Sequence, residues 1–456
     1  MTTPAQLDRI DDTIDANMEH FVEQLARLCA QPSVSAQNAG IDACAELVAE
    51  MLTEHGFAGE IVDSQGYPVV LGEAEGQSDK TLLFYLHYDV QPPEPLDHWD
   101  SPPFELTRRG EQLFARGVCD DKGHIITRLA ALTAVRDVFG ELPCNVRFVI
   151  EGEEEIGSPN LDAFVRNHRR RLAADACIWE FGGVDGEGKP QQSLGMRGIC
   201  YVQLSVQTAT RDAHSGLAGS LFPNASWRLV WALDSLKSED EQVQIPGFYD
   251  DVIGPSERDL ELLARLPDEA PMWQEMFGLQ HFLKGVEGGP EWHRQAIFEP
   301  TCTICGLTAG YQGPGSKTVL PARALAKVDF RLVPDQVPED IVQKLRAHLD
   351  AQGFDDVAIQ VMSGQRPAKV DPDDPFVQLA NQTAREVYGR EPSVAPMIGG
   401  SGPLYPFVER LGLPVVAAGI GYPGSRTHAP NENIRLDVFK QGIRHTARIV
   451  EAFPRL

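Results

Sequence analysis

Three widely separated apolar runs in this chain each lead directly into a carboxylate or an imidazole. The runs and the polar residues that follow them are Leu82–Leu86 with His87, Val146–Ile150 with Glu151, and Ala176–Trp179 with Glu180. Short apolar runs rich in β-branched and aromatic residues are typical of buried strands. In open parallel sheets, ligands bind beyond the carboxyl ends of the strands. The sequence therefore predicts an α/β sheet with a polar site at that edge.

Length and composition restrict the class of protein. At 456 residues the chain exceeds the size at which one core usually stops growing, so we expect two domains. A formal net charge of −26 opposes binding to phosphate backbones, so nucleic acid is not an expected partner. We find neither an apolar signal-peptide core nor a run of about 18 apolar residues, which argues against a membrane partner. The sequence favours a cytoplasmic protein.

The eight cysteines are scattered along the chain, which is typical of reduced thiols in a reducing compartment. Cys302 and Cys305 form a single C-x-x-C pair. No second pair follows at the spacing of a zinc ribbon, so we expect thiols in a strand and assign them no chemistry.

The pattern of elements changes twice along the chain. Helices with an apolar stripe alternate with strands up to about residue 196 and again from about residue 367, which favours a mainly parallel sheet flanked by helices. Between these points, strands of alternating polarity near 201–205, 324–332 and 357–362 favour an inserted α+β unit with an antiparallel sheet. The Pro-containing stretch 246–271 is expected to be irregular. The predicted domains are 1–196 with 367–456, and 197–366.

Two of the candidate ligand segments lie in the first half of the chain. His87 has a carboxylate, Asp89, two residues on, which could orient the imidazole of a metal ligand. Asp120 and Asp121 are adjacent in a loop before a helix, where a carboxylate could bridge two cations or cap the helix, with one role for each aspartate.

The acidic segment 151–155 could be a solvated charged surface, but its position directly after a buried strand favours a cation site, where neighbouring carboxylates can have separate roles. His428 is a second histidine that follows a predicted strand. Together these segments offer an imidazole and a carboxylate for each of two ions, plus one bridging carboxylate. The five candidate metal ligands are His87, Asp120, Glu155, Glu180 and His428. Nitrogen and oxygen ligands suit zinc or manganese.

With these motifs the chain resembles the co-catalytic zinc exopeptidase and deacylase superfamily, and most of all its dipeptidase branch. The superfamily includes carnosinase, carboxypeptidase G, acetylornithine deacetylase and succinyl-diaminopimelate desuccinylase. Four segments carry the resemblance in family order: His87–Pro92, His98–Phe104, Arg116–Gly123 and Glu151–Ser158. One position departs from the pattern, because dipeptidase relatives often carry Asp where this chain has Glu180.

The resemblance implies a catalytic domain, residues 1–196 with 367–456, and an inserted lid or dimerisation domain, residues 197–366. It implies two Zn²⁺ ions per subunit, with Mn²⁺ or Co²⁺ as alternatives. His87 and Glu180 would hold one ion, Glu155 and His428 the other, and Asp120 would bridge them. Asp89 would orient His87, and the peptide bond between Asp120 and Asp121 would be cis.

The resemblance also implies Glu154 as the general base. In the inserted unit, His214 would reach the active site of the partner subunit in a homodimer; its segment could instead be a turn before a helix. Arg331, Gly400 and Ser401 would bind the substrate carboxylate, although the glycine-rich loop could simply be a turn at a strand end.

We therefore expect a metal-dependent hydrolase of dipeptides or small peptides with a free C-terminal carboxylate. One alternative is a deacylase or desuccinylase of N-acyl amino acids, which needs the same metals and a different pocket. The other is a non-catalytic binder of peptides or amino-acid conjugates, and such a protein has no need of a general base.

Overall fold

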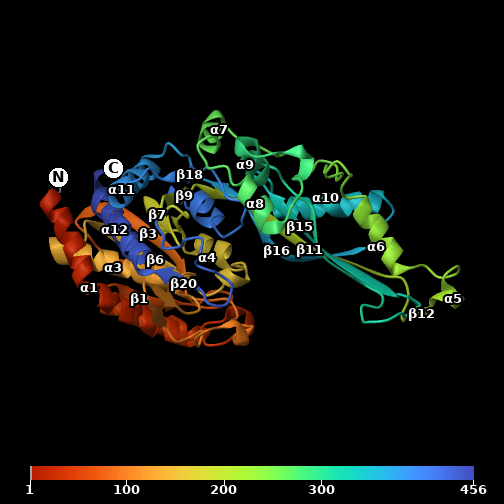
Figure 1. The fold of residues 1–456 in the computed structure, drawn as a ribbon, viewed down its shortest axis with the longest axis horizontal. Coiled ribbons are helices and arrows are strands. Elements are labelled where there is room, and N and C mark those ends of the chain that lie inside the picture. Colours follow the sequence, from red (N-terminus) through yellow and green to blue (C-terminus); the bar gives the residue numbers. More distant parts are fainter. Residues whose placement is uncertain (1–2) are drawn as a thin grey trace. The chain divides into compact units, whose positions relative to one another are not determined.

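A computed structural model of the chain describes residues 3–456. Its backbone contacts define two compact units. The first unit comprises the residues up to 194 together with 370–396 and 403–456, and the second comprises 195–369 and 397–402. Figure 1 labels the elements of both units and colours them along the sequence.

The first unit contains a six-stranded sheet in the order β1-β2-β6-β3-β7-β19. Strands β6, β3, β7 and β19 run parallel to one another, whereas β1 and β2 form an antiparallel edge, with β2 antiparallel to β6. The strands are β1 (Ala58–Val62), β2 (Val69–Ala74), β3 (Ser78–His87), β6 (Cys144–Glu151), β7 (Ala176–Trp179) and β19 (Val415–Ala417). The prediction of a mainly parallel central sheet is confirmed.

Strand β3 buries side chains on both faces of this sheet. The ring of Phe84 stacks on Phe148 with centroids 5.1 Å apart. The next residue, Tyr85, lies 4.6 Å from the rings of both Trp179 and Phe407. Successive strand residues point to opposite faces, so both faces are covered by protein. This explains why the strand reads as a continuous apolar run.

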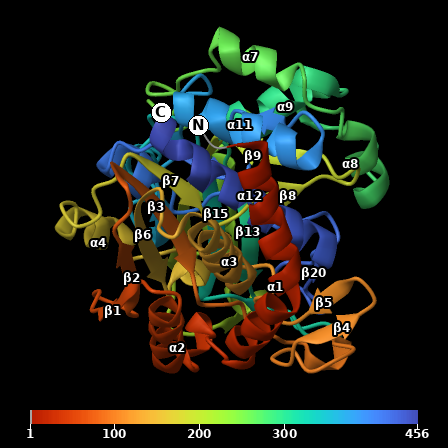
Figure 2. The ribbon, with the colours of Figure 1, turned by 90° about the vertical axis from the view of Figure 1, so that its left-hand side faces the viewer.

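Helix α3 packs against α1 and α12 (Figure 2). The first helix begins where the Thr3 side chain accepts the backbone N–H of Gln6, with Pro4 in its first turn, and ends two residues before Pro32. The helices of the first unit are α1 (Pro4–Ala30), α2 (Ile41–Glu54), α3 (Lys122–Phe139), α4 (Leu161–Asn167), α11 (Pro375–Tyr388) and α12 (Leu436–Ala452).

Two small sheets complete the first unit. One contains β4 (Thr107–Arg109), β5 (Gln112–Phe114) and β20 (Asn433–Arg435), and the other β8 (Gly183–Val184), β9 (Pro190–Ser193) and β18 (Ser393–Ala395). Because β20 pairs antiparallel with β5, the chain after residue 114 lies beside the chain before residue 433.

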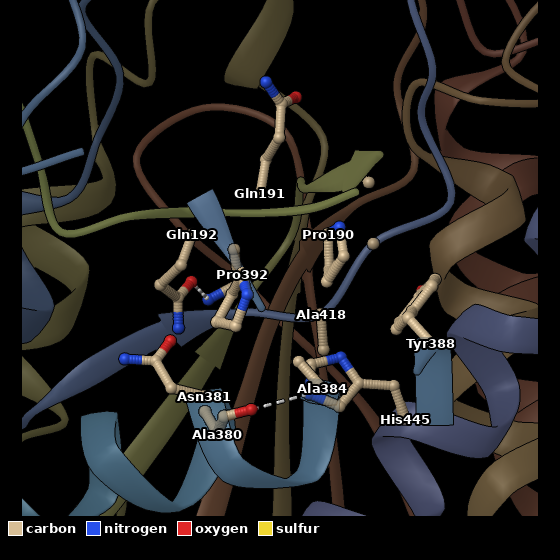
Figure 3. Close-up of a pocket in the computed structure, with 13 residues that line it drawn as sticks. Pro190, Gln191, Gln192, Ala380, Asn381, Ala384, Tyr388, Pro392, Ala418 and His445 are labelled. Atoms are coloured by element: carbon tan, nitrogen blue, oxygen red, sulfur yellow. Dashed lines mark hydrogen bonds between the residues drawn. The ribbon is translucent and has the colours of Figure 1, made fainter. Parts of the chain in front are cut away.

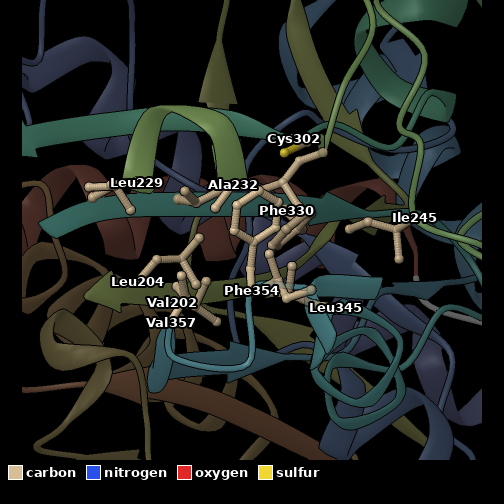
Figure 4. Close-up of a cluster of buried hydrophobic side chains, with 14 of the residues drawn as sticks. Val202, Leu204, Leu229, Ala232, Ile245, Cys302, Phe330, Leu345, Phe354 and Val357 are labelled. Atoms are coloured by element: carbon tan, nitrogen blue, oxygen red, sulfur yellow. The ribbon is translucent and has the colours of Figure 1, made fainter. Parts of the chain in front are cut away.

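The second unit is built on an antiparallel sheet in the order β13-β15-β11-β16, as predicted. Every second residue of β11 is buried, and these side chains form one core with residues of α6, α10 and β15 (Figure 4). Its strands are β10 (Gly195–Met196), β11 (Gly198–Gln207), β12 (Ala213–His214), β13 (Thr303–Ala309), β14 (Val319–Leu320), β15 (Arg323–Leu332), β16 (Ala358–Gln365) and β17 (Ala368–Lys369). Its helices are α5 (Ser215–Ala218), α6 (Ala225–Asp234), α7 (Glu257–Leu263), α8 (Ala270–Phe277), α9 (Gly289–Phe298) and α10 (Pro338–Ala351).

The stretch predicted to be irregular contains helices, and that prediction is wrong. Helix α7 begins at Ser256, whose side chain forms a reciprocal capping pair with Asp259. Helix α8 carries Pro271 in its first turn. Proline is tolerated at that position because the first N–H groups of a helix have no partner within the helix. The prolines here therefore mark helix starts as well as loops.

Residues 397–402 group with the second unit, whereas the sequence assigned them to the first domain. The backbone N–H of Arg197 donates to the carbonyl of Gly400 at 3.0 Å, and that of Ile398 donates to Gly195 at 2.9 Å. These bonds fix the glycine-rich loop to the start of the inserted unit.

Within residues 3–456, no helix combines the length and the apolar character needed to cross a bilayer. All eight cysteines are unpaired, and seven of them are buried. Cys302 is buried just before β13, and Cys305 is exposed on that strand.

Candidate metal centre

The strand ends bring the predicted ligands to one edge of the central sheet. His87 is the last residue of β3 and is paired in register with Glu151 at the end of the parallel strand β6. Glu180 follows the last residue of β7. His87 and Glu180 are buried, and His87 Nε2 lies 3.9 Å from Glu180 Oε2. The edge is thus lined by ionisable groups inside the protein.

Asp120 lies between two histidines from distant parts of the chain. Its Oδ1 is 3.1 Å from His87 Nε2, and its Oδ2 is 3.0 Å from His428 Nε2. The peptide bond from Asp120 to Asp121 is cis, as expected. The two oxygens of one carboxylate therefore face two different imidazoles, which is the arrangement that a bridging ligand requires.

Two groups of three side chains have ligand atoms close enough together to hold an ion. The atoms of each group all lie within 4.8 Å of one another. One group is His87, Asp121 and Glu180, and the other is Asp120, Glu155 and His428. All five predicted ligands are therefore within these groups, and Asp121 is an addition to them.

Asp121 is a residue that the sequence reasoning did not include among the metal ligands. It is the N-cap residue of α3, but its side chain makes no capping hydrogen bond. Instead its Oδ2 accepts the backbone N–H of His87 at 3.2 Å, and its Oδ1 lies 2.7 Å from His124 Nδ1. The sequence signal for this residue was its position next to Asp120. The sequence favoured a helix cap for one of the two aspartates, but the side chain of Asp121 contacts His87 and His124 instead.

Asp89 holds two segments of the site in place. The Nδ1 of His87 donates to the main-chain carbonyl of Asp89 at 3.0 Å, which directs Nε2 toward Asp120. The carboxylate of Asp89 accepts the backbone N–H groups of Glu154 and Glu155 at 3.2 and 3.0 Å. Asp89 thus orients the imidazole at the end of β3 and also the segment with Glu154 and Glu155 that follows β6.

Glu154 lies in the short helical turn Glu154–Ile156 beside both groups of ligands. Burial raises the pKa of its carboxyl to about 8, with further increases from the negative charges of Asp120 and Glu155. Gln91 Nε2 donates to Glu155 Oε2 at 2.9 Å, which orients that neighbouring carboxylate. The pKa of the Glu154 carboxyl therefore lies near neutral pH, as is frequent for groups in functional sites.

Neighbouring carboxylates favour the charged forms of both histidines in the metal-free arrangement. Hydrogen bonds to Asp120 and Glu155 raise the pKa of His428 to about 10. Burial opposes charge on His87, but the hydrogen bonds to Asp120 and Asp89 raise its pKa well above the usual value. Burial would raise the pKa of Asp120, yet hydrogen bonds from His428 and His87 hold it well below its usual range. A bound metal ion would require the neutral imidazoles, whose Nε2 lone pairs could then coordinate it.

The residues present fit divalent cations. Burial raises the pKa of Glu180 well above its ordinary value, and the charge of Glu154 adds to the effect. Glu180 Oε2 is buried and has no hydrogen-bond partner among the described residues. Buried polar atoms normally have partners, so this oxygen is available to an ion. The set of donors consists of imidazole nitrogens and carboxylate oxygens, which suits zinc and manganese.

Three of the predicted site residues, His214, Arg331 and Ser401, form hydrogen bonds within the second unit. His214 is exposed in strand β12, and its Nδ1 accepts the backbone N–H of Gly216 at 3.0 Å. Arg331 Nη1 donates to Ser401 Oγ at 2.9 Å, while its Nε lies 3.4 Å from Asp329 Oδ2. Arg331 and Ser401 are thus in direct contact within the second unit.

A separate pocket in the first unit lies among β9, α11, β19 and α12 (Figure 3). It includes the buried side chains of Gln192, Asn381 and His445, and the ring of His445 is hydrogen-bonded to the carbonyl of Ala380 at 3.0 Å. None of the predicted site residues lines it. The ligand groups at the strand ends therefore remain the better candidate for chemistry.

Buried carboxylates arranged around two imidazoles are suited to a pair of divalent ions, and a further carboxylate beside them is suited to hydrolysis. The fold and the site thus define a dinuclear metallohydrolase. Comparison with known proteins narrows that class. A profile of peptidase family M20/M25/M40 matches residues 83–452, and the chain belongs to this family.

Several characterised relatives match nearly the whole chain. The chain is 28% identical to the Cys-Gly metallodipeptidase dug1 of Schizosaccharomyces pombe, with 96% of each sequence covered. It is 27% identical to the Beta-Ala-His dipeptidase of Homo sapiens, covering 94% of this chain and 89% of the relative. These similarities agree with the resemblance to the dipeptidase branch.

Solved structures show the same fold. An M20 family metallo-carboxypeptidase from Sulfolobus solfataricus, Sso-CP2, superposes with a TM-score of 0.91 at 35% identity, covering 96% of this chain and 99% of that one. Human carnosine dipeptidase 1 superposes with a TM-score of 0.81 at 26% identity, covering 99% of this chain and all of the other.

Proposed function

We propose that this protein hydrolyses the peptide bond of dipeptides and small peptides that have a free C-terminal carboxylate, using two divalent metal ions. The observation that carries the proposal is Asp120, whose two carboxylate oxygens face His87 and His428 at 3.1 and 3.0 Å. Relatives named as dipeptidases and a carboxypeptidase support the same class of substrate.

His87 and Glu180 would hold one ion, Glu155 and His428 the other, and Asp120 would bridge them; Asp121 is a further candidate for the first. When bound, such ions lower the pKa of water toward about 7 and polarise a carbonyl oxygen. Zn²⁺ is the metal that the family resemblance implies, with Mn²⁺ and Co²⁺ as alternatives, and imidazole and carboxylate ligands suit zinc and manganese.

Glu154 would transfer the protons of the reaction. It accepts a proton from the attacking water and returns it to the amine that leaves when the peptide bond breaks. Its pKa of about 8 in the metal-free protein reflects burial and two neighbouring carboxylates, and bound cations would favour its charged form. A carboxylate ready to accept a proton at neutral pH is what a general base requires.

The second unit would supply substrate recognition. Arg331, held by Ser401, presents a planar guanidinium that can pair with a carboxylate through two parallel hydrogen bonds. Gly400 belongs to the same loop and would contribute backbone contacts. His214 would stabilise the negative charge that develops on the carbonyl oxygen.

We also propose a cytoplasmic homodimer in which His214 serves the active site of the partner subunit. Large apolar side chains are exposed near His214, including Leu217, Leu221 and Phe222, and Trp227 and Trp231 are exposed on α6. Contiguous exposed apolar groups of this kind are typical of protein interfaces. The net charge of −26 argues against nucleic acid as a partner.

The test is a panel of dipeptides, C-terminally amidated dipeptides and N-acyl amino acids, assayed with chelated protein and with protein reloaded with zinc or manganese. We expect metal-dependent release of amino acids from the free dipeptides. Glu154→Gln should retain its metals and lose about 10²- to 10⁴-fold in kcat. Preference for N-acyl amino acids would favour a deacylase, and a parent protein without turnover would favour a binder; unchanged turnover by Glu154→Gln would rule out the assigned base.

A further inference from the structure

Glu432 is a fully buried carboxylate that belongs to none of the ligand groups. It accepts four hydrogen bonds, all from one short segment of the chain. Its Oε2 accepts Arg116 Nη1 at 2.6 Å and the backbone N–H of Gly117 at 3.0 Å. Its Oε1 accepts the backbone N–H groups of Cys119 at 2.9 Å and of Asp120 at 3.0 Å. The carboxylate therefore holds the loop that ends at the bridging ligand.

This contact joins the two segments that supply Asp120 and His428. Glu432 lies four residues after His428 and directly before β20, which pairs with β5. The pairing continues past the strands, because the backbone N–H of Ala115 donates to the carbonyl of Glu432 at 3.2 Å. After Ala115, the backbone N–H groups of Gly117, Cys119 and Asp120 donate to the side chain of Glu432 and not to backbone carbonyls of that segment. One residue thus connects the loop of the bridging aspartate to the loop of the second histidine.

The chemistry of the contact requires a carboxylate. All four partners are donors, and an ionised carboxylate is an acceptor at both oxygens. An amide in the same place would direct its NH₂ group at one pair of donors and leave buried N–H groups without partners. The contact is therefore specific for Glu and stiffens the loop at the position of Asp120.

We propose that Glu432 is a positioning residue that sets the distance between Asp120 and His428 and so sets the affinity for one of the two ions. The inference rests on the proposed metal centre. Both ions would share Asp120, but the first keeps His87 and Glu180 on strand ends that Glu432 does not touch, whereas the second also relies on His428, which lies four residues before Glu432. Loss of the Glu432 contacts should consequently weaken one ion much more than the other.

The experiment is a Co²⁺ titration of metal-free protein, followed by absorption and by competition with a chelator. For the unaltered protein we expect two bound ions. For Glu432→Gln we expect one ion to bind within about threefold of the unaltered protein and the other to bind about 10- to 100-fold more weakly, as for other groups that orient ligands. Glu432→Asp keeps the charge and should recover part of the loss.

Asp259→Asn is the matched control, because Asp259 is also fully buried and is paired with Lys369, in the second unit. It should lower the unfolding midpoint and leave both Co²⁺ affinities unchanged. A general loss of folded protein would reduce both Co²⁺ affinities together. A change in the ratio of the two affinities therefore reports the positioning role of Glu432. Equal affinities in Glu432→Gln and the parent would overturn the inference, whereas a parent that fails to bind two ions would overturn the metal centre itself.

A second measurement needs no variant. It tests whether Glu432 holds the loop before metal binds, even if Glu432→Gln does not fold. Amide hydrogen exchange of the metal-free protein reports whether the loop is held in advance. We expect slow exchange at Gly117, Cys119 and Asp120, because Glu432 accepts all three N–H groups. Fast exchange that slows only when Co²⁺ is added would mean that the metal orders this loop, and the inference would be wrong.

Discussion

Asp89 Oδ2 accepts the backbone N–H of Glu155 at 3.0 Å, which links the end of strand β3 to the acidic turn that follows β6. The same carboxylate accepts the N–H of Glu154 through Oδ1 at 3.2 Å. Asp89 is therefore more than a partner of His87, because it positions both the proposed base and a proposed ligand.

Asp89→Asn should reduce kcat or metal affinity without abolishing metal binding. The amide keeps one acceptor and places NH₂ against a backbone donor, so one of the two N–H groups loses its partner. We expect a loss of about 10- to 100-fold in kcat or in metal affinity. Steady-state kinetics at saturating zinc, together with metal analysis, measure the two effects separately. Unchanged values for both would contradict this role.

Arg331→Met should selectively remove recognition of the substrate carboxylate. A charge-assisted pair contributes about 1.5 to 3 kcal/mol, so kcat/KM for free dipeptides should fall by roughly 10- to 100-fold. Amidated dipeptides provide the control, because they lack the charge and their slower hydrolysis should be nearly unaffected. An equal loss for both kinds of substrate would mean that Arg331 has another role.

A mixing experiment tests whether His214 acts across a dimer. Glu154→Gln and His214→Ala subunits should each be nearly inactive alone. In a mixed dimer, one site combines an intact Glu154 with an intact His214 from the partner, so random reassociation should restore about a quarter of full activity. If His214 served its own subunit, no mixture of these variants would regain activity.

Two buried histidines should make the fold sensitive to acid. Burial lowers the pKa values of His55 and His445 from the ordinary value of 6.5 to about 4. Below pH 6.5 the unfolded chain binds protons that the folded protein does not, so stability falls as the pH decreases from about 7 to 4.

Each of these histidines accounts for a loss of about 3 kcal/mol at the acid end. His55→Gln should reduce the slope of unfolding free energy against pH over this range, measured by urea denaturation. A variant at His55 with the parent slope would contradict the assignment.

The central sheet and the candidate ligands were predictable because each predicted strand is a continuous apolar run that ends at a polar residue. Asp120 and His428 were predicted as ligands from their positions in loops beside strands and helices, but their contact joins segments far apart in sequence and is seen only in the folded chain. Helices α8 and α9 escaped prediction because a proline in the first turn of each resembles a loop residue, and α7 escaped because Pro255 lies directly before its N-cap residue Ser256. Glu432 gave no sequence signal, because its role depends on four donors that only the folded chain assembles.

The most direct test of the whole account is anomalous diffraction from crystals of the zinc-loaded protein. The account predicts two peaks about 3.5 to 4 Å apart, with Asp120 between them, one bonded to His87 and the other to His428. A single peak, or two peaks that do not share Asp120, would contradict it.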